Sequence, residues 1–153
     1  MTTLRIYDYR DGVLALDLSD LVDLLAPRSL EASWTASPVR VNHPDLGRFC
    51  DEFMVVGQGK AGQHPLEVLA ANGSSFDGIR FSEAAHTARQ VIWGQFVAAL
   101  SEQDDHWVDI RAIDSTFYEV TTSDKAVLNA VWASYKDVRV ASGPTISVPI
   151  DRI

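Results

Sequence analysis

The sequence predicts an α+β fold in which an antiparallel sheet of about five to six strands packs against a long helix, residues 82–101, and a shorter C-terminal helix, residues 124–136. Two observations lead to this prediction. Apolar and polar residues alternate toward both ends of the chain, as in strands with one buried face. Elsewhere, apolar residues recur every three or four positions, as on one face of an amphipathic helix.

The N-terminal segment predicts a β-hairpin followed by a short helix and another strand. Apolar residues alternate over 3–9 and again over 13–18, and Asp11-Gly12 between them is a strong hairpin-turn signal. A helix is expected over 20–26, where a proline ends it. Alternation resumes over 30–36, which predicts a third strand.

The middle of the chain is less regular. Prolines and glycines punctuate residues 38–63, which gives no clear element beyond one short helix or strand near 45–56. A short helix is expected over 64–72, because Pro65 suits its first turn and Gly73 suits its C-cap. Three histidines lie beside turns or breaks and are expected to be exposed: His43, His64 and His106.

Residues 82–101 show the most extended helical pattern. Ser82 is a candidate N-cap, and Gly94 within the segment suggests that another element approaches closely. The apolar residues at helical spacing are Ala85, Ala88, Ile92, Phe96 and Leu100.

The C-terminal third predicts two strands, a helix and a final strand. The corresponding residues are 108–112, 116–121, 124–136 and 137–141. We therefore expect a single domain over 1–141, with 142–153 as a tail or an extra strand.

The charge is acidic and unevenly distributed. The chain of 153 residues has a formal net charge of −8, with nine Asp/Glu against five Lys/Arg in both 1–53 and 101–153, and three against three between them. A nucleic-acid partner is not expected, because no basic cluster is present. Cys50 is the only cysteine, and neither a signal peptide nor a membrane-length apolar stretch is visible. These features predict a cytoplasmic protein.

No residue pattern specifies a reaction. Glu83 and His86 form a Glu-x-x-His pair, a spacing that di-iron bundles use twice, but here it occurs once. The glycines around Lys60 lack the spacing and the hydroxyl of a phosphate loop, and His43-Pro44-Asp45 resembles a co-chaperone tripeptide without its flanking helices. No cofactor and no metal site is predicted.

An acidic run is the main candidate for a binding surface. In the functional interpretation its carboxylates dock a basic partner and Trp107 is an aromatic anchor. In the structural interpretation the run is a solvated loop and strand edge with a half-buried tryptophan. The candidate partner-binding residues are Glu102, Asp104, Asp105, Trp107, Asp109 and Asp114.

Two segments resemble small acidic immunity-type proteins of bacterial toxin systems. They are Val91-Ile-Trp-Gly-Gln-Phe96, expected to close a helix, and Ile113-Asp-Ser-Thr-Phe-Tyr-Glu-Val120, which precedes a short helix. The resemblance covers about the last 70 residues. It implies a stoichiometric inhibitor and transfers no site residue.

Three functions follow from these observations. The first is a non-enzymatic protein that binds a basic partner, such as a toxin, through an acidic surface. The second is a small metal-dependent enzyme that uses Glu83 and His86. The third is a structural subunit of a larger assembly, in which residues 145–153 add a strand to a neighbour.

Overall fold

The computed structural model describes residues 1–43, 48–57, 64–100 and 106–142. Its helices are α1 (Leu18–Leu24), α2 (Arg28–Glu31), α3 (Pro65–Asn72), α4 (Gly78–Thr87) and α5 (Lys125–Ser134). Its strands are β1 (Thr2–Ile6), β2 (Tyr9–Arg10), β3 (Val13–Leu14), β4 (Ser33–Ser37), β5 (Val39–His43), β6 (Arg48–Glu52), β7 (Met54–Gly57), β8 (Phe76–Asp77), β9 (Ala88–Ala99), β10 (His106–Ile113), β11 (Phe117–Thr122) and β12 (Val138–Ala141).

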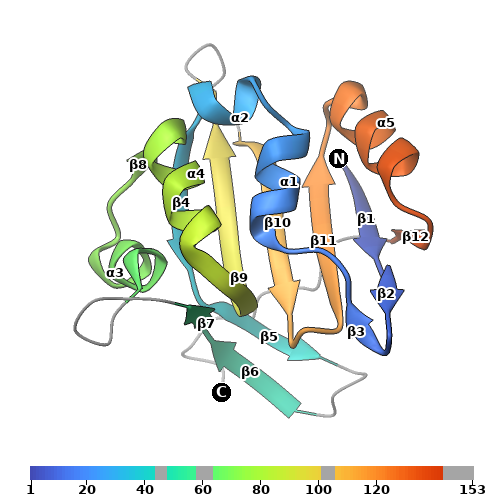
Figure 1. Ribbon diagram of the computed structural model, residues 1–153, viewed down its shortest axis with the longest axis horizontal. Coiled ribbons are helices and arrows are strands. Elements are labelled where there is room, and N and C mark those ends of the chain that lie inside the picture. The colour runs from blue at the N-terminus through green and yellow to red at the C-terminus, as the bar shows by residue number, and fades with distance from the viewer. Residues whose placement is uncertain (44–47, 58–63, 101–105, 143–153) are drawn as a thin grey trace.

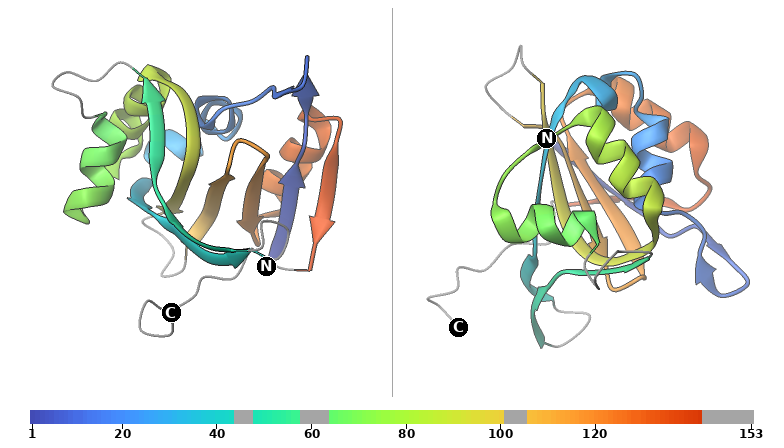
Figure 2. Two further views of the ribbon diagram at one scale, coloured as in Figure 1. Left: turned by 90° about the horizontal axis from the view of Figure 1, so that it is seen from below. Right: turned by 60° about the vertical axis from the view of Figure 1, so that its left-hand side comes forward.

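An antiparallel sheet of eight strands organises the described chain. Its order is β12-β1-β11-β10-β9-β4-β8, and β7 also pairs with β9. Helices α1, α2, α4 and α5 lie on one face of this sheet, while α3 packs beside β4 (Figures 1 and 2). Two separate hairpins, β2–β3 and β5–β6, extend from it. The α+β class is therefore confirmed, and the described sheet has more strands than the five to six predicted.

The main core fills the layer between the sheet and its helices. Each central strand contributes alternate residues to it, as a pleated sheet requires. Trp34 of β4 stacks on Phe81 of α4, with ring centroids 4.4 Å apart, and Phe81 in turn contacts Phe96 of β9. These three rings are fully buried and join the helix layer to the middle of the sheet.

Several short elements form where their sequence signals predict them. Asp11 and Gly12 have φ angles of 55° and 78°, so both occupy the left-handed region that a tight hairpin turn needs. Gly73 ends α3 with a φ of 63°, and Asp124 caps α5 by accepting a bond from the Ala126 amide. The predicted helices 64–72 and 124–136 are thus present with slightly different bounds.

The predicted helix 82–101 is wrong in its second half. Helix α4 ends at Thr87, and residues 88–99 form β9, the strand at the centre of the sheet. The positions Ile92, Phe96 and Leu100 are four residues apart, a spacing that fits a helix and also fits alternate positions of a strand. The β-branched and aromatic residues between them favour the strand, which pairs with β10 and β4.

At Gly94 the expected close approach by another segment is made by the Phe53 ring, although the Phe96 ring of the same strand lies closer. A Cβ atom at this position would lie 2.8 Å from the Phe96 ring and 3.2 Å from the Phe53 ring.

The tail predicted over 142–153 lies outside the described residues from 143 onward.

Candidate functional site

Trp107 is a core residue and not a surface anchor. Its side chain is 3% exposed, and its indole Nε1–H donates to Asp124 Oδ2 over 2.9 Å. The guanidinium of Arg28 lies 5.4 Å from the centre of its ring and bonds the same carboxylate oxygen. The predicted docking surface therefore lacks the aromatic anchor that Trp107 was expected to provide. Glu102, Asp104 and Asp105 lie outside the described residues.

A register shift in β10 explains the position of Trp107. His106 pairs with Ala99 and Val108 pairs with Ala98, so β10 has an extra residue between these pairs. Strict alternation would place Trp107 on the same face as Asp109. The bulge instead turns it into the main core beside Val108, where it contacts the start of α5.

The other two predicted carboxylates do not complete an acidic surface. Asp109 is largely buried and accepts a hydrogen bond from the Gln95 amide over 3.1 Å. Burial raises the pKa of its carboxyl, although the charge of Arg111 acts in the opposite direction. Asp114 lies in the turn after β10, with a φ of 52°. Asp109 and Asp114 therefore occupy a strand interior and a strand end.

A row of polar residues crosses the sheet on the face away from the helices. Glu119 is fully buried in this row and accepts a 2.8 Å bond from Arg5 Nε. The register places one residue from each of six neighbouring strands in the row: Arg139, Arg5, Glu119, Arg111, Gln95 and Ser37. This row is not predicted from the sequence, although each of its charged residues follows an apolar one in an alternating strand. Within the row, Arg5 and Glu119 form a structural ion pair.

Glu83 and His86 belong to different environments. His86 Nε2 lies 2.9 Å from Asp23 Oδ1 of α1. Glu83 instead lines a recess of about 330 Å³ together with Phe76 and Arg80. Within the described part of the chain, no three His, Cys, Asp or Glu side chains are grouped as a metal site requires. The alternative of a metal enzyme built on this pair has no geometric support there.

His64 is buried, at 2% exposure, and not exposed as expected. Its Nδ1 accepts from the Leu66 amide over 3.1 Å and so caps α3. A neutral imidazole that accepts at Nδ1 carries its proton on Nε2. That Nε2–H therefore donates to Thr87 Oγ1, 2.8 Å away, and the Thr87 hydroxyl donates to the Ala84 carbonyl.

This bond direction decides what the pair can do chemically. A general base must accept the proton of its nucleophile, whereas His64 donates to Thr87 and has no free lone pair facing it. The arrangement joins α3 to α4 and does not activate the hydroxyl.

An acidic face on α1 is the described counterpart of the predicted acidic surface. Residues 11–27 contain four aspartates and no lysine or arginine. Asp20 and Asp23 are exposed and three residues apart, so they share one side of the helix. Asp17 caps the same helix and is partly buried; burial raises the pKa of its carboxyl. We refer to Asp17, Asp20 and Asp23 as the α1 acidic face.

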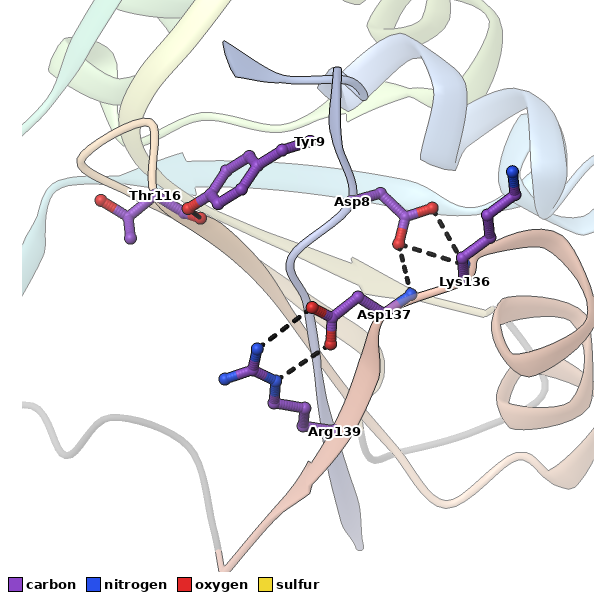
Figure 3. Close-up of polar contacts among 6 residues, drawn as sticks. All are labelled: Asp8, Tyr9, Thr116, Lys136, Asp137 and Arg139. Atoms are coloured by element: carbon purple, nitrogen blue, oxygen red, sulfur yellow. Dashed lines mark hydrogen bonds and ion pairs between the residues drawn. The ribbon is translucent and has the colours of Figure 1, made fainter. Parts of the chain in front are cut away.

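A recess of about 420 Å³ lies between the β2–β3 hairpin and the connection from α5 to β12 (Figure 3). The Asp8 carboxylate accepts bonds from the backbone amides of Lys136 and Asp137, the shortest over 2.7 Å. Tyr9 donates its hydroxyl proton to the Thr116 carbonyl. These bonds fix the hairpin against the sheet.

None of the described helices combines the length and apolar character needed to cross a membrane. A scan against protein-family models finds no matching family, and searches of curated proteins and of solved structures find no matching relative.

Proposed function

We propose that this chain is a non-enzymatic protein that binds a basic protein partner through its acidic surface. The observation that carries the proposal is the α1 acidic face, in which Asp20 and Asp23 are exposed and the segment 11–27 contains no lysine or arginine. Such a surface attracts a basic partner over several ångströms and favours correct encounter complexes. Asp104 and Asp105 add acidic charge from the segment before β10.

The polar contacts of the described residues also favour binding over catalysis. His64 holds its proton on the nitrogen that faces Thr87, and His86 pairs with an aspartate. Asp17 accepts from the Val91 amide and the Tyr118 hydroxyl, which explains its partly buried position. The position of each of these side chains is therefore explained by a hydrogen bond within the protein, and no substrate is needed to explain it.

A bacterial toxin is the specific partner that the sequence resemblance favours. The segment 113–120 leads through β11 to the helix α5. The segment 91–96 lies within β9 and does not close a helix. The proposal therefore depends on the acidic surface, and the toxin is the partner that we would test first.

The proposal is tested by capture of partners from lysate of the native host. The tagged protein is incubated at low and at high salt, and bound proteins are identified by mass spectrometry. We expect a basic partner that is retained at low salt and lost at high salt, because exposed charges are screened. Capture of the same proteins at both salts, or of none, would contradict an electrostatic interface.

A further inference from the structure

The recess beside the β2–β3 hairpin contains carboxylates that are already satisfied. Asp8 accepts three bonds from two backbone amides, and Asp137 receives Arg139 Nε and Nη2, each over 3.0 Å (Figure 3). The hydrogen bond from Arg139 lowers the pKa of Asp137. Neither carboxylate therefore needs a cation from a ligand.

The same recess retains positive charge. Arg10 and Lys136 line it and are exposed, and no ion pair reaches either of them from the described part of the chain. Figure 3 shows the Lys136 side chain extending away from Asp137. Arg10 and Lys136 equal the two lining carboxylates in number, but both carboxylates already accept hydrogen bonds from other groups. The two cations therefore remain available to an anion.

Aromatic rings and volume indicate the size of the ligand. Tyr7 and Tyr9 line the recess, and the guanidinium of Arg139 lies 4.1 Å from the centre of the Tyr7 ring. A volume of about 420 Å³ falls within the range of small-molecule sites and exceeds the needs of a simple ion. Tyrosine rings offer flat apolar contact beside the cations.

We propose that this recess binds a small organic anion, whose carboxylate or phosphate group faces Arg10 and Lys136 and whose flat body contacts Tyr7 and Tyr9. Guanidinium and ammonium groups bind both kinds of oxyanion through charge-assisted hydrogen bonds. The site is separate from the α1 acidic face, and its occupancy does not depend on a protein partner.

The test uses three probes that share one ring and differ in charge: benzoate, phenyl phosphate and neutral benzamide. Each is titrated at constant ionic strength into the ¹⁵N-labelled protein, and backbone amide shifts of the hairpin and of Lys136 and Asp137 are followed by NMR. The double variant Arg10→Gln/Lys136→Gln removes both cations. Arg89→Gln is the matched control, because Arg89 is exposed on β9 and does not line the recess.

We expect saturable shifts with at least one anion, a weaker response to benzamide, and a loss of affinity of about tenfold or more in the double variant. Arg89→Gln should bind as the unchanged protein does. A preference for phenyl phosphate over benzoate would identify phosphate as the group, and the reverse would identify carboxylate. Equal binding of benzamide, unchanged affinity in a folded double variant, or no saturable shift with either anion would overturn the proposal.

Discussion

His64 Nε2 and Thr87 Oγ1 lie 2.8 Å apart, and this bond joins the N-cap of α3 to the last residue of α4. The other ring nitrogen of His64 accepts from the Leu66 amide. The contact with Leu66 requires the neutral imidazole, since the protonated ring would direct a second N–H at the Leu66 amide. The position of α3 is therefore coupled to the protonation state of one side chain.

Stability should consequently fall in mild acid. Burial lowers the pKa of His64, although the charge of Glu67 and the contact with Thr87 raise it. The unfolded chain then binds the proton more readily than the folded one, so stability is lost as the pH falls below the ordinary value of 6.5. His64→Asn keeps an N-capping oxygen and removes this titration. Denaturant unfolding between about pH 7 and pH 5 should show a smaller pH dependence in the variant; parallel profiles would contradict the assignment.

Replacing Trp107 with phenylalanine should destabilise the fold and leave partner binding intact. The variant loses the bond to Asp124 inside the core, for which we expect about 1–3 kcal/mol less unfolding free energy. Trp132→Phe is the matched control, because Trp132 is 47% exposed on α5. This substitution should lower the unfolding free energy by less than Trp107→Phe does. Chemical denaturation measures both variants. A large loss of partner affinity in a folded Trp107→Phe variant would restore the surface-anchor interpretation.

Gly78→Ala should be more destabilising than Gly94→Ala. A Cβ atom on Gly78 would lie 2.3 Å from the Ser29 carbonyl oxygen, so α2 and α4 would have to separate. At Gly94 the nearest atoms belong to the Phe96 ring, which can rotate. We expect a cost of about 3 kcal/mol at Gly78 and a smaller one at Gly94, measured by denaturant midpoints. The opposite order would mean that the helix layer adjusts more easily than the sheet.

Tyr135 should ionise unusually late. Burial raises the pKa of its phenol to about 12, and the charges of Asp20 and Asp8 add to this effect. Because the folded-state pKa is raised, the associated stability is present below the ordinary value of 10.0 and is lost as the pH rises through about 12. Burial also raises the pKa of Tyr118, so an ultraviolet titration should show two late phenols, of which Tyr135→Phe removes one. Ionisation of all four tyrosines in one early step would contradict this environment.

Local signals in the sequence predict the turns, because each depends on a few neighbouring residues. The N-cap expected at Ser82 is wrong, since Ser82 lies inside α4 and Asp77 caps this helix. The turn at Asp11-Gly12 and the C-cap at Gly73 form as expected. Whether residues 88–99 form a helix or a strand depends instead on pairing with β10 and β4. A spacing of four residues between apolar positions does not reveal this pairing. Tertiary pairing thus decides between helix and strand at the centre of the fold.

The candidate site was harder to predict, because side-chain direction depends on register. The bulge after His106 moves Trp107 into the core, and nothing in its local pattern announces it. The polar row through Arg5, Glu119 and Arg111 requires three strands to align. By contrast, the acidity of residues 11–27 is visible in the sequence, although the predicted binding surface lies later in the chain.

The measurement that tests the central claim most directly is the affinity of the captured basic partner for charge-reversed variants. Asp23→Lys alters the α1 acidic face, and Asp104→Lys/Asp105→Lys alters the segment before β10. Asp51→Lys is the control, because Asp51 is an exposed aspartate on β6 that pairs with Arg40. We predict that calorimetry shows affinity lowered about tenfold or more by either of the first two variants and unchanged by the control. Equal affinity in all three variants, each verified as folded, would contradict binding through the acidic surface.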